Sequence, residues 1–118
     1  MKKISIIVLL LLVVTVFGCS KSNPEMDNFA KCLTDKGVKF FGSWWCPHCA
    51  NEKKLFGDSM KYVNYIECSL PDKSDQTQVC KEAKIESYPT FEFADGSRVV
   101  GEKSLEELAE KTGCALSQ

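Results

Sequence analysis

Apolar and polar residues follow two different periods along this chain. Between Met26 and Leu33 the apolar positions fall three and four apart, which is the spacing of one helix face, whereas between Val63 and Cys68 they alternate as in a strand. In chain order the pattern predicts helix 27–36, strand 38–43, helix 46–56, strand 63–68, helix 75–84, strands 91–93 and 98–100, and a last helix between residues 104 and 113. This order predicts an α/β sheet sandwiched between helices.

Polar residues and glycines at the ends of these segments support the boundaries. Asp27 is placed to cap the first helix, and Ser74 or Asp75 is placed to cap the third. Asp95-Gly96 predicts a hairpin turn, and the capping box Ser104-Leu105-Glu106-Glu107 marks the start of the last helix. Five phenylalanines are expected in the core: Phe29, Phe40, Phe41, Phe91 and Phe93.

The first residues have a different character from the rest of the chain. Lys2 and Lys3 precede an apolar run of 14 residues from Ile4 to Phe17, and small residues follow. This order predicts a secretory signal peptide over residues 1–18. The run is shorter than the roughly 20 residues of a spanning helix, so a retained membrane anchor is the less favoured alternative.

The junction Val16-Phe17-Gly18-Cys19 resembles the lipobox of bacterial lipoproteins, in which the cysteine is lipidated. Phe17 departs from that pattern, which prefers a small residue there. The resemblance implies a lipid anchor on Cys19, a tether over residues 19–26 and a domain over residues 27–118. An ordinary cleaved signal with an incidental Cys19 is the alternative. Either way we expect an extracytoplasmic protein, in the periplasm or on the outer face of the cell membrane.

Charge and cysteine content narrow the function classes. Without Lys2 and Lys3 the chain has 13 basic and 16 acidic residues, so we expect no nucleic-acid partner. Six cysteines remain besides Cys19, which is a high count for a domain of this size. Because disulfides form and persist outside the cytoplasm, export makes disulfide chemistry the expected use of these cysteines.

Cys46-Pro47-His48-Cys49 is the candidate chemical site. The predicted strand and helix place Cys46 as an exposed thiol at a helix N-terminus, where unpaired N–H groups and the helix dipole stabilise a thiolate. Cys49 lies one turn further in and is expected to be more buried. His48 can add positive charge beside Cys46, which favours the thiolate over the disulfide and predicts an oxidising pair.

A zinc site is the alternative use of such a pair. Zinc usually takes four ligands, yet the chain's only histidine, His48, lies between Cys46 and Cys49. Cys68 and Cys80 are spaced too widely for a zinc knuckle. We therefore expect no metal and no other cofactor.

Trp45-Cys46-Pro47-His48-Cys49 at a strand-to-helix junction, followed by Tyr88-Pro89-Thr90, resembles the thioredoxin fold. The resemblance covers residues from about 27 to 114 and implies a three-layer α/β/α sandwich with a mixed sheet. More narrowly, Lys31-Cys32-Leu33, Trp44 to Cys49, Glu67-Cys68-Ser69, Tyr88-Pro89-Thr90 and Thr112-Gly113-Cys114 resemble thioredoxin-like domains that work with bacterial homologues of vitamin K epoxide reductase. This implies a membrane quinone reductase as redox partner.

The resemblance also implies residue roles. Cys46 is then the nucleophile and Cys49 the resolving thiol, with Pro47 and His48 tuning the pair. Pro89 is then a cis-proline against the pair, and Trp45 and Tyr88 face the substrate, whereas Trp44 fits packing equally well. The cysteine tetrapeptide also matches the bacterial periplasmic disulfide-forming oxidase.

One position departs from the resemblance. Thioredoxin and the periplasmic oxidase have a buried acid six residues before the first cysteine, where this chain has Phe40. Deprotonation of Cys49 must therefore use water, another group such as Glu52, or the substrate.

The other cysteines allow further bonds. A Cys68–Cys80 disulfide closes a polar loop and stabilises by roughly 3 kcal/mol, with a second redox pair as the alternative. Parity suggests that Cys32 and Cys114 also pair. The helices that carry them usually lie on opposite faces of a thioredoxin sheet, so free buried thiols are the alternative.

The leading functional hypothesis is an exported oxidoreductase that passes its disulfide to protein thiols in oxidative folding. A reductase or isomerase runs the same chemistry in the opposite direction. A lipoprotein that binds a ligand or delivers a metal on a redox scaffold, without catalysis, is the third hypothesis.

Overall fold

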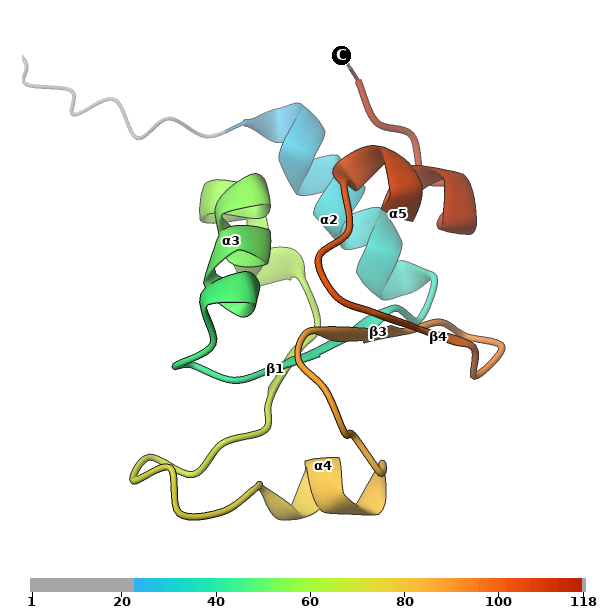
Figure 1. Cartoon of the computed structure of the whole chain (residues 1–118). Coiled ribbons are helices and arrows are strands. Elements are labelled where there is room, and N and C mark those ends of the chain that lie inside the picture. The colour runs from blue at the N-terminus through green and yellow to red at the C-terminus, as the bar shows by residue number, and fades with distance from the viewer. Residues whose placement is uncertain (1–22, 118) are drawn as a thin grey trace, which may run out of the picture.

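The computed structural model describes residues 23–117, which form a four-stranded mixed sheet covered by helices (Figure 1). The strand order is β2-β1-β3-β4, with β1 parallel to β2 and antiparallel to β3. The elements are α2 (Pro24–Asp35), β1 (Lys39–Gly42), α3 (Pro47–Phe56), the 3-10 helix η1 (Gly57–Tyr62), β2 (Tyr65–Glu67), α4 (Gln78–Glu82), β3 (Thr90–Glu92), β4 (Arg98–Val100) and α5 (Leu105–Thr112).

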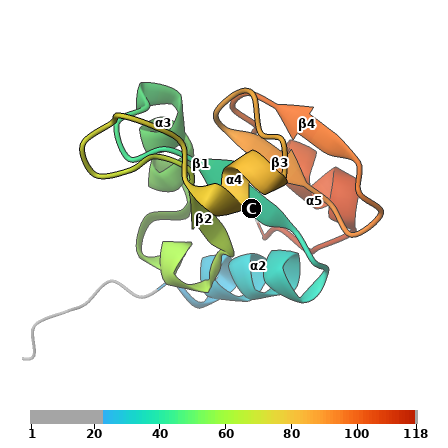
Figure 2. The ribbon, with the colours of Figure 1, turned by 90° about the horizontal axis from the view of Figure 1, so that it is seen from below.

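Helices lie on both faces of the sheet, as predicted. Helices α2, α3 and α5 lie on one face and the short α4 lies on the other (Figures 1 and 2). Consecutive residues of β1 point to opposite faces and divide the core in two. Phe40 packs in the larger cluster with residues of α2, α3 and α5, while Phe41 packs with Cys68, Cys80 and Ile85. The five phenylalanines predicted for the core are all buried.

Helix α2 begins earlier than predicted, and Asp27 does not cap it. Asn23 is the N-cap, and its side chain accepts a hydrogen bond from the Met26 N–H at 3.2 Å. Pro24 occupies the first turn, where a missing N–H costs nothing. Asp27 lies inside the helix and accepts a hydrogen bond from the Ser59 hydroxyl at 2.7 Å. Residues 24–26, which we assigned to the tether, are therefore helical.

The segment between β2 and β3 also differs from prediction. Thr77 is the N-cap of α4, so the predicted caps Ser74 and Asp75 are wrong. Both make local bonds instead: the Ser74 hydroxyl donates to Asp72, and Asp75 pairs with Lys81. These bonds hold an ordered loop where the polar pattern suggested the start of a helix.

The C-terminal half follows the prediction closely. Gly96 takes a φ of +82° in the turn between β3 and β4, where a side chain would be strained. The capping box of Ser104 and Glu107 opens α5, and Gly113 ends it in the left-handed conformation.

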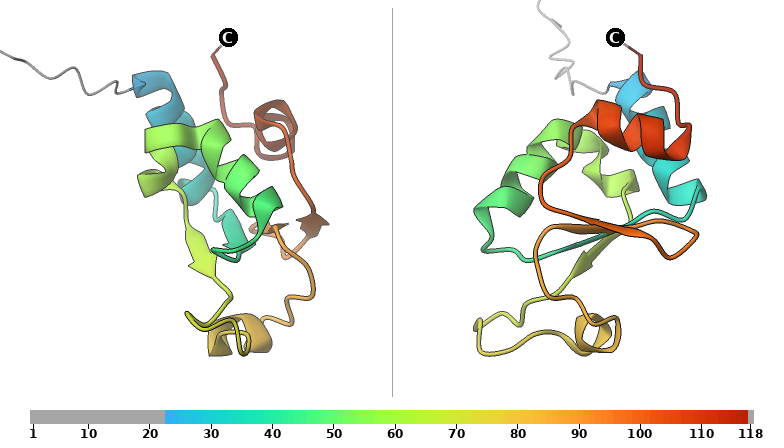
Figure 3. Two further views of the ribbon diagram at one scale, coloured as in Figure 1. Left: turned by 60° about the vertical axis from the view of Figure 1, so that its left-hand side comes forward. Right: turned by 45° about the vertical axis from the view of Figure 1, so that its right-hand side comes forward.

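A disulfide joins the first and last helices of the described chain. Cys32 of α2 and Cys114, just after α5, are bonded, with Cα atoms 5.9 Å apart. Our expectation that these helices lie on opposite faces is wrong, because α2 and α5 lie on the same face (Figure 3). The free-thiol alternative is therefore excluded for this pair.

The predicted signal peptide, the lipidation of Cys19 and residues 19–22 of the tether lie outside the described residues. Within residues 23–117, no helix has the length and apolar character needed to span a bilayer.

Candidate active site

Cys46 lies where β1 passes into α3, as predicted. Its φ and ψ of −81° and 121° are extended, so it is the N-cap, and Pro47 opens the helix. The Cys46 carbonyl accepts the Ala50 N–H at 3.0 Å and closes the first turn. The sulfur therefore sits among the free N–H groups of a helix N-terminus, which favour negative charge.

The cysteine pair is the reduced pair of the described chain. Cys46 and Cys49 are both free, whereas the other four described cysteines are in disulfides. Cys49 is fully buried, as expected, but Cys46 is only 7% exposed, less than the prediction of an exposed thiol. A partner sulfur must approach through this narrow opening.

Tyr88 and Pro89 pack over Cys46. The Tyr88–Pro89 bond is cis, as the resemblance implied, and the Cys46 sulfur lies 3.8 Å from the Tyr88 carbonyl oxygen. Pro89 is fully buried and Tyr88 half-buried. The chain on either side of this bond therefore forms one wall of the opening.

Two exposed tryptophans border the same region. Trp45 is 45% exposed, donates its indole N–H to the Ser69 hydroxyl at 2.8 Å and meets the Tyr88 ring edge to face. Trp44 is 50% exposed, so the other half of its surface packs against the protein. Its indole N–H donates to the Leu70 carbonyl at 3.3 Å. Both rings are held by the loop that follows β2.

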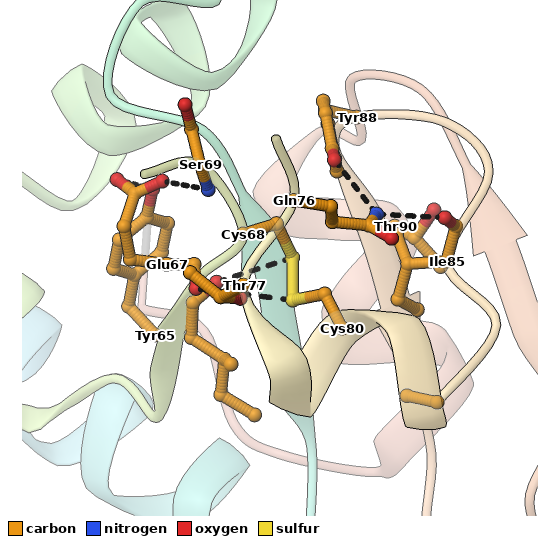
Figure 4. The surroundings of a disulfide bond; sticks show 12 residues. Tyr65, Glu67, Cys68, Ser69, Gln76, Thr77, Cys80, Ile85, Tyr88 and Thr90 are labelled. Carbon is orange, nitrogen blue, oxygen red and sulfur yellow. Dashed lines mark hydrogen bonds between the residues drawn. A yellow bond between two sulfur atoms is a disulfide. The ribbon is translucent and has the colours of Figure 1, made fainter. Parts of the chain in front are cut away.

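The Cys68–Cys80 disulfide anchors that loop beneath the site (Figure 4). The bond confirms the predicted pairing, and the full burial of both cysteines favours a structural role over a second redox pair. Gln76 reaches from the loop to the Tyr88 hydroxyl at 2.8 Å and to the Ile85 carbonyl at 2.8 Å. The bridge thus supports the residues that hold Trp45 and Tyr88.

Burial controls the protonation of Cys49. Burial, together with a smaller effect of the neighbouring Cys46 thiol, raises the pKa of the Cys49 thiol to about 12. A hydrogen bond with the Ser43 backbone and the positive charge of Lys53 act in the opposite direction. At neutral pH Cys49 is therefore a thiol that needs help to ionise.

The position of the missing acid, Phe40, and the alternative proton acceptor, Glu52, differ in surroundings. Phe40 is fully buried, stacks on Phe91 and meets Tyr65 edge to face, so the site of the missing acid is filled by aromatic rings. Glu52 is also fully buried, and one carboxylate oxygen accepts the Lys103 N–H at 2.9 Å while the other has no partner. Burial raises the pKa of Glu52 to about 7.

His48 projects outward from the start of α3. Its side chain is 66% exposed, and Nδ1 lies 3.0 Å from an oxygen of Glu102. No group of three or more His, Cys, Asp or Glu side chains within residues 23–117 is arranged to hold a metal.

Comparison with known proteins identifies the family. The family described as Thioredoxin matches residues 19–113, which is most of the chain. The chain belongs to the thioredoxin family. With a free Cys46–Cys49 pair at the start of α3, this thioredoxin domain is a protein thiol–disulfide oxidoreductase.

Similar proteins differ in how much of them the thioredoxin domain covers. "Thiol-disulfide oxidoreductase LTO1" from Arabidopsis thaliana is 39% identical over 103 residues, which is 84% of this chain and 27% of the plant protein. "Thioredoxin" from Callithrix jacchus is 32% identical over 89 residues, which is 71% of this chain and 84% of that protein. The chain thus spans about a quarter of the length of the plant protein.

Sequence reasoning missed three residues of the site. Lys53 had a signal, because it lies four residues after Cys49 on one helical face. The sequence predicted a strand at Tyr65, but it gave no sign that the Tyr65 ring lies near the Cys49 sulfur. Glu102 follows β4 in a turn and carries no local signal that it meets His48.

Proposed function

We propose that the chain passes a Cys46–Cys49 disulfide to reduced protein substrates outside the cytoplasm. The observation that carries the proposal is the placement of Cys46: a reduced thiol at the N-terminus of α3, with its sulfur 3.8 Å from the Tyr88 carbonyl. Cys49 lies one turn behind it and is fully buried. A substrate therefore meets Cys46 first.

The exchange has two steps. A substrate thiolate attacks the Cys46 sulfur of the disulfide, the Cys46–Cys49 bond breaks, and Cys49 leaves as a thiolate. A second substrate thiolate then attacks the substrate sulfur of the mixed disulfide, and Cys46 leaves as a thiolate. Two electrons pass from the substrate to the pair, and a new substrate disulfide forms.

Two features support the oxidising direction. The helix N-terminus and the charge of a protonated His48 favour a thiolate at Cys46, which makes the dithiol a better product. Phe40 occupies the position at which thioredoxin has the acid that assists Cys49. When the pair reduces a substrate, Cys49 must attack as a thiolate without that help. A reductase cycle must ionise the Cys49 thiol before it can attack, whereas an oxidase cycle starts from the disulfide.

The exposed aromatic border of the site suits a protein substrate. Trp44, Trp45 and the Tyr88 backbone lie around the Cys46 opening, where an extended peptide can pack on the rings. We assign substrate contact to Trp45 and to the Tyr88 backbone, with the fully buried Pro89 holding that backbone beside Cys46. A surface of this kind accepts many sequences, because the contact is apolar and the bonds go to backbone.

Location and partner complete the proposal. The leader and Cys19 support export with a lipid anchor, which keeps the domain near the membrane. A membrane quinone reductase related to vitamin K epoxide reductase then reoxidises Cys46 and Cys49. The length of the plant relative beyond the matched region is compatible with a catalytic unit that works beside other domains.

Trapping tests this function directly. Cys49→Ala protein, expressed with its leader in a bacterium, should accumulate mixed disulfides on Cys46 that disappear on reduction and are identified by mass spectrometry. The control is Cys46→Ala/Cys49→Ala protein. Exported clients together with a membrane protein support the proposal, whereas equal yields from both variants contradict it.

A further inference from the structure

The Cys49 sulfur shares a small space with the ring of Tyr65. A Cβ atom added to Gly42 would lie 3.0 Å from the Cys49 sulfur and 2.9 Å from Cε2 of Tyr65. Gly42 therefore leaves just enough room for the sulfur and the ring edge to approach the same point of β1. The resolving thiol therefore lies beside the edge of the Tyr65 ring.

That ring holds a positive charge. The Lys53 ammonium lies 3.9 Å from the centroid of the Tyr65 ring, and Lys53 is half-buried. A cation over an aromatic face is attracted by the ring electrons, and more strongly where water is partly excluded. Tyr65 is fixed in turn, because its hydroxyl donates to Glu67 at 3.0 Å.

We propose that Lys53, positioned by the Tyr65 ring, is the counter-charge that stabilises the Cys49 thiolate during disulfide exchange. In the oxidising direction Cys49 is the leaving group, and in the reducing direction it is the attacking group. The thiolate exists briefly in both, so one ammonium serves both. The proton on Cys49 is exchanged with solvent, and Lys53 stays protonated throughout.

Among the described groups that act on Cys49, Lys53 is the one that carries a positive charge. From α3 the ionisable neighbours are Cys46 and Lys53, and from β2 they are Tyr65 with Glu67 behind it. Strand β1 contributes Gly42, with Phe40 where an acid could have stood, and the Ser43 backbone follows directly after the strand. Burial raises the Cys49 pKa, and the Lys53 charge lowers it.

Glu52, which the sequence suggested as an acceptor of the Cys49 proton, bonds a different part of the fold. Its hydrogen-bonded oxygen is held by the Lys103 N–H, on the segment before α5, and its nearby charges are Glu102, Glu107 and Lys103. From α3, Glu52 therefore contacts the segment before α5, whereas Lys53 contacts Tyr65 of β2. The inference rests on the proposed exchange at Cys46 and Cys49.

A pH-jump experiment tests the role of Lys53. A chromogenic aromatic thiol is attached to Cys46 at about pH 4, where Cys49 is protonated, and its release by Cys49 is followed by absorbance after jumps to about pH 6 to 9. Lys53→Met removes the charge and keeps the apolar stem, Lys53→Arg restores a cation, and Lys54→Met is the matched control on the exposed side of α3.

We expect release from Lys53→Met to be about tenfold slower at each pH, which corresponds to a rise of one unit in the Cys49 pKa. Lys53→Arg should recover most of the rate, and Lys54→Met should match the wild type. Equal rates for Lys53→Met and Lys54→Met would overturn the inference and leave the exchange intact. Wild-type release no faster than that of Cys49→Ala would instead overturn the exchange itself.

Discussion

The His48 imidazole and the Glu102 carboxylate meet although 54 residues separate them, with Nδ1 3.0 Å from the Glu102 oxygen. His48 stands in the first turn of α3, and Glu102 lies just after β4. The hydrogen bond with His48 holds the pKa of Glu102 below its ordinary value, so the carboxylate is ionised at neutral pH. The outward position of the imidazole is therefore fixed by a second element of the fold.

Replacement of His48 by Ala should make the Cys46–Cys49 pair less oxidising. A positive charge on the imidazole would favour the Cys46 thiolate, so removal of the ring weakens the dithiol relative to the disulfide. We expect the reduction potential to fall by about 30 mV, or about 1.4 kcal/mol, in equilibration against glutathione. Lys54→Met controls for the loss of one charge on α3, and an equal fall in both variants would refute a local role of His48.

Replacement of Trp45 by Ala should impair exchange with proteins more than exchange with small thiols. The ring borders the Cys46 opening and contacts Tyr88, so a docked peptide loses packing area while the sulfur keeps its surroundings. We expect about a tenfold loss in kcat/KM for an unfolded protein and little change for a small dithiol. Leu55→Ala, which removes an apolar residue of the same 45% exposure, is the control.

The two disulfides should contribute unequally to stability. Cys32–Cys114 joins residues 82 apart and Cys68–Cys80 joins residues 12 apart. Loop-closure entropy predicts losses of about 4.5 and about 3 kcal/mol when each pair is replaced by alanines. Urea unfolding of the two double variants measures both values. A larger loss for the Cys68–Cys80 variant would show that entropy does not govern the difference.

Glu52 should make the protein less stable as pH rises through neutrality. Burial raises its folded pKa to about 7 from an ordinary 4.5, so the folded state binds more protons than the unfolded state between these values. Stability from this group is full below about pH 4.5, falls as pH rises to about 7, and is constant above. The fall should approach about 3 kcal/mol.

Glu52→Gln measures this contribution, because the amide oxygen can still accept the Lys103 N–H. The stability difference between variant and wild type should grow from about pH 4.5 to about 7 and then level off. Glu106→Gln, at an exposed position of α5, should show no such growth. A flat difference for Glu52→Gln would mean that the carboxyl ionises normally in the folded protein.

Local signals predicted the elements that carry the site. The period of the apolar residues and the Ser104 capping box gave the helices and strands, and the Cys46 motif at a strand-to-helix junction was confirmed as a helix N-cap. Element ends were less predictable. Asn23 and Thr77 cap their helices instead of Asp27 and Ser74, since several polar residues compete at each boundary and neighbours decide among them.

Contacts between segments that are far apart along the chain could not be predicted from local sequence patterns. The face on which α2 packs decides whether Cys32 can reach Cys114, and no local pattern reports that face. The approach of Tyr65 to Cys49 depends on the register of β2 against β1, which pairs Gly42 with Glu67. Such contacts follow from packing of the whole domain.

The equilibrium reduction potential of the Cys46–Cys49 pair tests the proposed direction of exchange most directly. Purified protein is equilibrated in glutathione buffers, thiols are alkylated, and the fraction of Cys46–Cys49 disulfide is measured by mass spectrometry, with Cys68–Cys80 and Cys32–Cys114 as internal references. A potential between about −120 and −180 mV is the result expected of an oxidant. A potential below about −230 mV would contradict the account and make the protein a reductase.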